Sequence, residues 1–291
     1  MDMDAILITG PTASGKSALA LELARRHDGV VINADSMQVY DTLRVLTARP
    51  SEEEMEGISH RLYGHVPAGA AYSTGDWLRE AEKLVQELEG QGRLPVFVGG
   101  TGLYFKALTG GLSEMPAIPE EIRDRYRVRL IAEGAEALHR ELSLRDPETA
   151  AQLHPGDGQR IVRALEVFEA TGKPIRAFQG RPGPMVIDPA RAQKIIVQPE
   201  RPVLYERIDR RFKAMMASGA VEEVQALLTL GLKPEMPAMK AIGVSQIAAM
   251  LKGEMTPEEV IEKSATATRQ YAKRQMTWFR NQMDESWTRQ G

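Results

Sequence analysis

The sequence contains no cysteine, and this absence excludes disulfide bonds, thiolate nucleophiles and cysteine-ligated zinc. Histidine is also scarce, with 5 residues in the chain, and none of them stands at the spacing of a helical metal-binding pair. We therefore expect no structural metal site built from these side chains.

Long apolar runs and a charge excess of either sign are also missing. The chain starts with Met1, Asp2, Met3 and Asp4, which is acidic where a secretory signal is basic, and the apolar segment that follows is much shorter than a membrane span. We expect a cytoplasmic, monomeric protein without a membrane partner. The formal net charge of −3 argues against a basic coat over the whole surface, although such a sum can conceal one basic face.

The remaining composition is that of a globular protein, with 43% hydrophobic and 26% charged residues. In the first part of the chain, the segments 5–9, 30–32 and 94–98 are apolar and short enough to be buried strands. The segments 16–26 and 77–88 repeat apolar residues at helical spacing. This alternation predicts an α/β fold with a parallel sheet covered on both faces and ligands at the carboxyl ends of its strands.

The pattern becomes helical without strands over residues 118–172, and a strand pattern returns at 194–198. A chain of 291 residues is long for one compact unit, so an insertion or a second small domain is expected. We predict a first part of the core at 1–113, a helical insertion at 114–192, and a second, mainly helical part of the core at 193–291 that ends in a basic helix.

One segment fits the pattern G-x-x-x-x-G-K-[ST] of a phosphate-binding P-loop, and it stands between a predicted strand and a predicted amphipathic helix. Its backbone N–H groups and the helix start attract anions, Lys16 can neutralise phosphate oxygens, and the Ser17 hydroxyl can ligate Mg²⁺. A glycine-rich turn that binds nothing is the less favoured alternative, because both flanks fit. The predicted ligand is a phosphorylated small molecule, bound by Gly10, Pro11, Thr12, Ala13, Ser14, Gly15, Lys16 and Ser17.

Polar residues also follow the next two predicted strands. Asp35 comes directly after the second apolar run, where a carboxylate faces the P-loop and can hold Mg²⁺ or act as a general base. A helix N-cap is an equal alternative on spacing alone. Thr101 stands in the glycine-rich segment 99–102 after the third run, where backbone can approach a ligand closely, but an ordinary strand-to-helix turn is again an equal alternative.

Basic residues gather further along the chain. Arg160 and Arg163 share one predicted helix face, and Arg207 and Arg211 share another. Residues 264–283 contain several basic and aromatic side chains and no acid. Any single cluster is usually a solvated helix face, but several of them in an acidic protein favour an electrostatic footprint with stacking groups.

Taken together, these features resemble the tRNA dimethylallyltransferases, which transfer an isopentenyl-type group to N6 of the adenosine 3′ of the anticodon. The resemblance covers nearly the whole chain. Each string alone is weak evidence, whereas the ordered set is specific. The matching strings are 10–17, 35–40, 98–104, 160–167, 241–243, 272–275 and 277–280.

The resemblance implies a P-loop NTPase-like core with a helical insertion domain, tRNA as partner, and a channel where dimethylallyl diphosphate meets a flipped-out adenine. It assigns Asp35 as general base and Thr101 as the hydroxyl that bonds the oxygen bridging dimethylallyl and diphosphate. Lys16, Ser17 and Arg211 match contacts to the diphosphate and to a Mg²⁺ cofactor. The implied tRNA-binding positions are Asp35, Ser36, Met37, Gln38, Thr101, Arg123, Gln159, Arg160, Ile161, Val162, Arg163, Lys273 and Arg274.

The chain departs from the usual pattern of this family near the expected channel entrance. Asp41 replaces a basic residue, Leu46 and Arg49 replace a glycine and a lysine, and Gly64 stands where an acid is common. The absence of cysteine also excludes the zinc-finger extension of eukaryotic members, which indicates a bacterial type.

Two other functions share some of these features. A small-molecule or nucleotide kinase would use the same P-loop core, but it requires an arginine-bearing lid and a nucleotide-base pocket, and it leaves residues 99–102 and the basic C-terminal helix without a role. A nucleotide-sensing RNA-binding module would not need Asp35 or Thr101. The ordered set of strings favours prenyl transfer over both.

Overall fold

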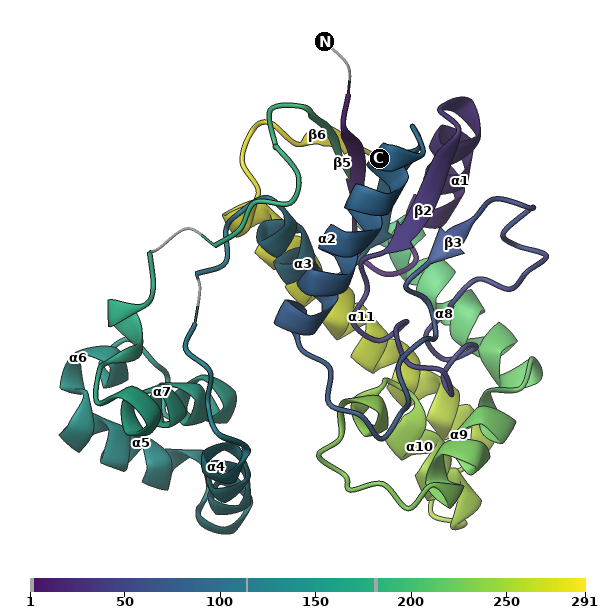
Figure 1. The fold of residues 1–291 in the computed structure, drawn as a ribbon. Helices are drawn as coiled ribbons and strands as arrows, with labels where there is room; N and C mark the ends of the chain where they lie inside the picture. Colours follow the sequence, from purple (N-terminus) through teal and green to yellow (C-terminus); the bar gives the residue numbers. More distant parts are fainter. Residues whose placement is uncertain (1–2, 114, 181–182) are drawn as a thin grey trace. The chain divides into compact units, whose positions relative to one another are not determined.

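The computed structural model describes residues 3–113, 115–180 and 183–291. The chain divides into two compact units, one formed by residues 1–109 with 186–291 and the other by residues 110–185 (Figure 1). The second unit begins and ends a few residues before the insertion that the sequence predicts. Its end lies at 185 because the N–H groups of Val186 and Ile187 both donate to the carbonyl of Leu108, at 3.0 Å each, and return the chain to the first unit.

A six-stranded parallel sheet forms the centre of the first unit, in the order β3-β2-β4-β1-β5-β6. The three predicted apolar runs become β1, β2 and β4, and β1 and β2 are buried along their whole length. The sequence did not predict β3 and β6, the short strands at the two edges. The bounds are Ala5–Thr9 (β1), Gly29–Asn33 (β2), His60–Arg61 (β3), Leu94–Gly99 (β4), Ala192–Val197 (β5) and Thr288–Gln290 (β6).

Capping side chains set the starts of two helices in this unit. The Ser73 hydroxyl accepts the N–H of Asp76 while the Asp76 carboxylate accepts the N–H of Ser73, and Thr256 and Glu259 form the same reciprocal pair before α11. The helices of this unit are α1 (Lys16–Arg26), α2 (Thr74–Gly90), α3 (Gly102–Leu108), α8 (Arg201–Ala217), α9 (Ala220–Thr229), α10 (Val244–Leu251) and α11 (Pro257–Gln282), with a 3-10 turn at Pro237–Lys240.

Helices cover both faces of the sheet. α1 packs on the face that Val96 and Val98 share. Phe97 stands between these two valines and therefore points to the opposite face, where its ring meets Trp77 of α2 with centroids 6.0 Å apart. Trp77 also stacks on Tyr104 of α3 at 4.2 Å. The carboxyl ends of the strands thus open between two helical layers.

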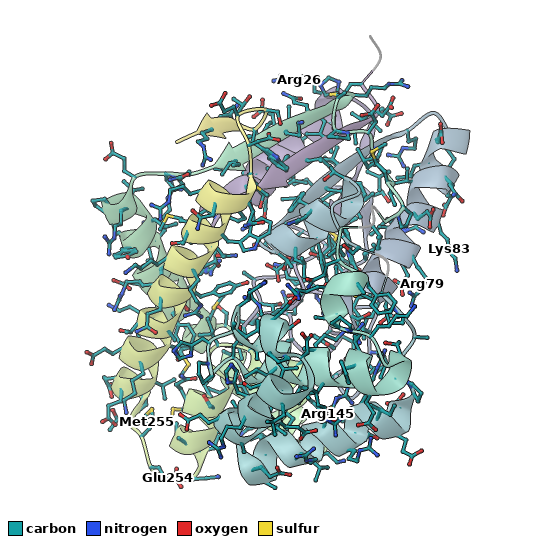
Figure 2. All side chains as sticks on the ribbon, turned by 90° about the vertical axis from the view of Figure 1, so that its left-hand side faces the viewer. Arg26, Arg79, Lys83, Arg145, Glu254 and Met255 are labelled. Carbon is teal, nitrogen blue, oxygen red and sulfur yellow. The ribbon has the colours of Figure 1, made fainter. Side chains whose placement is uncertain are left out.

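The outer side of α2 faces solvent. Arg79 and Lys83 lie one turn apart on this exposed side (Figure 2), whereas Trp77, Leu84 and Leu88 are buried. This division is the amphipathic pattern of a helix that covers a sheet. No helix in the described parts of the chain is long and apolar enough to cross a membrane.

The second unit consists of helices around a separate core. Tyr126, Leu138, Leu142 and Leu165 are fully buried there, and the Tyr126 hydroxyl donates to Glu169 at 2.9 Å. This core contains no residue of the sheet, so the unit satisfies its own hydrophobic packing. Its helices are α4 (Glu120–Glu133), α5 (Ala135–Arg145), α6 (Pro147–Ala150) and α7 (Gly158–Thr171), followed by a 3-10 turn at Ile175–Ala177.

Candidate active site

The P-loop joins the end of β1 to the start of α1, as its pattern predicts. Ala13 (φ 64°) and Gly15 (φ 94°) adopt left-handed backbone conformations, which turn successive N–H groups to one side and form a concave nest for an anion. α1 begins at the next residue, Lys16, so its dipole adds positive potential there. The Ser14 hydroxyl is buried and has no hydrogen-bond partner among the described residues. A phosphate oxygen in the nest would satisfy it.

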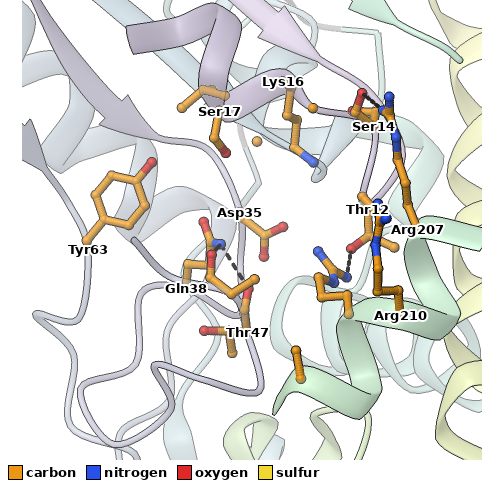
Figure 3. A pocket seen from close by; sticks show the side chains of 17 residues that line it. Thr12, Ser14, Lys16, Ser17, Asp35, Gln38, Thr47, Tyr63, Arg207 and Arg210 are labelled. Carbon is orange, nitrogen blue, oxygen red and sulfur yellow. Dashed lines mark hydrogen bonds between the residues drawn. The ribbon is translucent and has the colours of Figure 1, made fainter. Parts of the chain in front are cut away.

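The P-loop lines a cavity of about 670 Å³ (Figure 3). Three arginines of α8, Arg207, Arg210 and Arg211, line the same cavity. Arg207 donates to the carbonyl of Ser14 at 3.1 Å, and Arg211 donates to the hydroxyl of Thr12. Arg207 and Arg211 therefore hold the loop through its oxygens and also place cationic charge beside the anion nest.

Lys16 lies among these charges, and its ammonium donates to the carbonyl of Pro11 at 3.2 Å. Burial lowers the pKa of Lys16 to about 8, although the nearby Asp35 carboxylate opposes this effect and Arg211 adds to it. Burial also lowers the pKa of Arg211, again against the attraction of Asp35. Two desolvated cations lie here with one carboxylate, so a bound anion would stabilise their charged forms.

Asp35 follows β2 and lines the same cavity (Figure 3). The side chain of Asn33 shapes the turn, because its oxygen accepts the Asp35 N–H at 2.9 Å and its amide group donates to the Asp35 carbonyl at 3.0 Å. Oδ1 of Asp35 accepts the N–H of Met37 at 2.9 Å. Residues 36–39 form bends and turns rather than a helix, so the N-cap alternative for Asp35 is wrong.

Thr101 stands at the start of α3 and is joined to the Asp35 turn. Its hydroxyl accepts the N–H of Ser36 at 2.9 Å and donates to the Ser36 hydroxyl at 3.2 Å, and its own N–H donates to the carbonyl of Ala34 at 3.2 Å. Asp35 is among the described residues that line the 670 Å³ cavity, whereas Thr101 is not. Ser36, its partner, lines an adjoining cavity.

This second cavity has a volume of about 320 Å³, and Thr12, Asp35 and Arg211 line both cavities. Burial, with a smaller effect of Asp35, raises the pKa of Tyr271, which also lines it. Seven of the other lining residues are apolar, and Lys240 and Arg274 add two cations. A planar group with polar edges suits this lining better than a second phosphate. The apolar lining comprises Met37, Leu46, Ile208, Phe212, Met215, Ala241 and Ile242.

One loop closes both cavities, since Thr47 lines each of them. The Gln38 amide donates to the carbonyls of Thr47 and Ala48, each at 2.9 Å, so Gln38 holds this loop from inside (Figure 3). The Glu223 carboxylate accepts the N–H groups of residues 44–46 at 2.9, 2.6 and 3.1 Å and holds it from outside.

Three of the departures from the family pattern meet beside this loop. The Arg49 guanidinium donates to the carbonyls of Tyr40 and Asp41 at 3.1 and 3.0 Å. A Cβ added at Gly64 would lie 1.4 Å from Nη1 of Arg49. Any side chain at position 64 would therefore displace the Arg49 guanidinium.

The residues expected to bind tRNA lie in both units. In the second unit, Gln159 and Arg160 are exposed and Arg123 and Arg163 are half-buried. In the first unit, Lys273 and Arg274 are exposed on α11 and line a groove of about 510 Å³ with Gln270, Thr277, Trp278, Asn281 and Gln282.

Two of the residues expected to contact tRNA have buried side chains. Ile161 is fully buried and Val162 is 7% exposed, because both pack into the core of the second unit. The side chains of this string alternate between the core and the surface at helical spacing, so only part of the string can contact a partner.

Several site residues escaped the sequence analysis. Arg210 of α8 and Tyr63 line the 670 Å³ cavity, and the pKa of Tyr63 is raised by burial and by Asp35. Gln275 of α11 contacts the P-loop directly. Arg207 was identified only as part of a basic helix face with Arg211, and nothing local connects Tyr63 or Gln275 with the P-loop.

The chain is similar to proteins of known sequence family. The family described as IPP transferase matches residues 38–282, and the family described as isopentenyl transferase matches residues 3–66. A tRNA dimethylallyltransferase of Rhizobium meliloti is 74% identical over 288 residues, which cover 99% of this chain and 95% of the relative. One of Agrobacterium fabrum is also 74% identical, over 99% of this chain and 97% of the relative.

Solved structures agree with the sequence matches. The tRNA isopentenylpyrophosphate transferase of Bacillus halodurans is 35% identical with a TM-score of 0.69, covering 99% of this chain and 89% of the other. A eukaryotic dimethylallyltransferase described as acting on tRNA is 28% identical with a TM-score of 0.79, covering 94% of this chain and 69% of the other.

Proposed function

The chain belongs to the IPP transferase family, and on that premise we propose that its P-loop cavity binds dimethylallyl diphosphate. It is a tRNA dimethylallyltransferase in the sense of its curated relatives, and it transfers a dimethylallyl group to tRNA. The acceptor in this proposal is N6 of the adenosine 3′ of the anticodon. The main support for this proposal is that Asp35, Lys16, Arg207 and Arg211 all line the 670 Å³ cavity.

In the proposed reaction, the P-loop nest holds the diphosphate and Lys16 and Arg211 pair with it. The bond from adenine N6 to the allylic C1 forms as the bond from C1 to the bridging oxygen breaks, and the electron pair leaves with the diphosphate. Asp35 takes the N6 proton, because the N6 lone pair is delocalised into the ring and attack requires deprotonation as the bond forms. Thr101 turns its hydroxyl proton from Ser36 to the bridging oxygen, and donors at this position contribute about 10² or more each in rate.

A Mg²⁺ ion fits this cavity through Ser17. Ser17 lines the cavity and is exposed, so its hydroxyl is accessible to an ion there. Within the described ranges, no group of three or more His, Asp or Glu residues could hold a metal. Mg²⁺ is usually bound by few protein ligands together with substrate phosphates, where it neutralises developing charge. The proposed Mg²⁺ ion therefore takes one ligand from the protein, the Ser17 hydroxyl, and its other ligands are oxygens of the diphosphate and water.

The 320 Å³ cavity would receive the acceptor adenine. Tyr271 and the apolar lining suit a flipped-out base, and the shared Asp35 lies at its junction with the diphosphate cavity. Outside the cavities, Arg123, Gln159, Arg160, Arg163 and Lys273 would contact the tRNA. Arg274, which also lines the 320 Å³ cavity, would contact it at the cavity, and Ser36, Met37 and Gln38 would border the target nucleotide. We place the reaction in the cytoplasm, with the protein acting as a monomer.

Incubation with dimethylallyl diphosphate, Mg²⁺ and a tRNA that carries adenosine 3′ of its anticodon tests the function. The expected result is a mass gain of one dimethylallyl group on that nucleoside, found after digestion. A parallel reaction replaces the diphosphate with ATP. ATP hydrolysis or phosphorylated product without prenylated nucleoside would overturn the proposal in favour of a kinase.

A further inference from the structure

Gln275 of α11 links two segments of the first unit that are far apart in the sequence. Its side chain is 6% exposed. The amide oxygen accepts the N–H of Thr12 at 2.9 Å, and the amide nitrogen donates to the carbonyl of Gly100 at 2.9 Å. The oxygen and the nitrogen of one buried amide therefore join two backbone segments.

Both of these backbone segments belong to the proposed site. Thr12 is part of the P-loop, and its hydroxyl is held by Arg211. Gly100 directly precedes Thr101, and a Cβ added to it would lie 2.3 Å from the Gln275 amide nitrogen and 3.4 Å from Oδ2 of Asp35. Gln275, Gly100 and the Asp35 carboxylate are thus packed together without room for one more methyl group.

The hydrogen bond to Gln275 also directs one P-loop amide away from the diphosphate. The Thr12 N–H is directed to the α11 side chain, so anion binding falls to the other N–H groups of the nest and to Lys16. The role of Gln275 is consequently to place the loop rather than to contact the ligand.

We propose that Gln275 is a positioning residue that sets the separation between the P-loop, which holds the leaving group, and the turn that carries Thr101 beside Asp35. This inference rests on the proposed function. Reacting atoms must approach within about 3 to 3.5 Å, and a misplacement of about 1 Å can reduce the rate on the order of 10²-fold. The Gln275 side chain, with one hydrogen bond to each segment, fixes that separation before substrate binds.

Gln275→Met tests this role, because methionine has a similar length and cannot make either hydrogen bond. We expect kcat to fall about tenfold or more, while KM for dimethylallyl diphosphate and the Kd for tRNA change by less than about threefold. Gln275→Glu is the second variant. It retains an acceptor for the Thr12 N–H but sets an oxygen against the Gly100 carbonyl, so we expect the same loss of kcat with the KM for the diphosphate retained.

The matched control is Gln246→Met on α10, since the Gln246 oxygen also accepts a backbone N–H, that of Gly243 at 3.2 Å, and this residue lines neither cavity. Its kcat should equal that of the unaltered protein. Unchanged kcat in both Gln275 variants would overturn the inference, as would parallel losses of kcat, tRNA binding and melting temperature, which indicate a merely structural role. Failure of the unaltered protein to prenylate tRNA would instead overturn the proposed function.

Discussion

At the scale of single residues, Asp35 divides its two carboxylate oxygens between structure and chemistry. Oδ1 accepts the N–H of Met37 and shapes the turn, whereas Oδ2 lies beside Gly100. A base needs one oxygen with a fixed direction, and the Met37 bond supplies that direction. The carboxylate is therefore oriented before a substrate arrives.

Asp35→Asn should separate these two tasks, because the amide oxygen can still accept the Met37 N–H but the side chain can no longer take a proton. We expect turnover to fall by about 10² or more while tRNA affinity stays nearly intact. Single-turnover prenylation and tRNA binding assays measure the two quantities. Asp41→Asn, at an exposed position, is the matched control, and equal losses of binding and turnover would identify Asp35 as structural.

Lys16 makes the site sensitive to alkaline pH. Its pKa of about 8 in the free protein means that its charge is lost near pH 8 rather than near 10.5. We expect kcat/KM for dimethylallyl diphosphate to fall above pH 8, since a neutral amine cannot pair with the diphosphate. A pH profile with Lys16→Arg, which stays charged, should lack this decline, and a shared decline would assign it to another group.

The same shift has a consequence for stability, and its sign is opposite. The pKa of Lys16 is lower in the folded state than in the unfolded state, so between about pH 8 and 10.5 the unfolded chain binds more protons. The contribution of Lys16 to the free energy of unfolding therefore increases with pH across this window, while the activity that it supports decreases.

Local sequence determines how much of the site is predictable at this scale. The positions of the P-loop and Asp35 can be predicted from the sequence, because each follows a buried strand directly. Gln275 and Arg210 are not, because they enter the site from helices whose position depends on the tertiary packing of α8 and α11. A buried glutamine in a basic helix has no local pattern that distinguishes it from its exposed neighbours.

At the scale of elements, α9 holds the loop at residues 44–47 in place through hydrogen bonds. Glu223 lies in the first turn of α9 and accepts three N–H groups of the loop that carries Leu46 and Thr47. Carboxylate hydrogen bonds to backbone N–H groups are among the stronger ones in proteins. The loop wall of both cavities is therefore anchored to a helix by one side chain.

Glu223→Gln should release this wall, because the amide group has one oxygen and sets N–H against N–H. We expect KM for dimethylallyl diphosphate to rise about threefold to tenfold, with a loss of about 1 to 3 kcal/mol in the free energy of unfolding. Hydrogen exchange of residues 44–46 should accelerate. Glu222→Gln, an exposed acid in the same helical turn, is the control, and unchanged exchange in Glu223→Gln would contradict the anchor.

The elements themselves were predictable to different degrees. Buried strands such as β1 and β4 follow from apolar runs, whereas β3 and β6 are short edge strands whose residues include His60 and Arg61 and carry no such signal. The start of α2 at Thr74 follows from the capping pair Ser73 and Asp76 rather than from its apolar residues, which begin at Trp77.

At the scale of the whole molecule, the chain has two units with separate cores, and the proposed tRNA contacts lie on both. Arg160 and Arg163 stand on α7 of the second unit, and Lys273 stands on α11 of the first. The net charge of −3 shows that this basic character is local rather than general. A tRNA that contacts both units should therefore lose affinity when either cluster is neutralised.

Salt dependence measures these contacts, because each phosphate neutralised by the protein releases counterions when tRNA binds. We expect tRNA affinity to fall steeply between about 50 and 200 mM salt. Arg160→Gln with Arg163→Gln should reduce the slope of log Kd against log salt by about 1 to 2, and Lys273→Gln by about 1.

Lys83→Gln provides the control for these variants, since Lys83 is exposed on the outer side of α2 (Figure 2) and belongs to neither basic cluster. A reduced slope only for the α7 pair would restrict the tRNA to the second unit, and a reduced slope only for Lys273 would restrict it to the first. Reductions for both would show that the two units act together on one tRNA, because a contact with a single unit predicts that the other substitution has no effect on the slope.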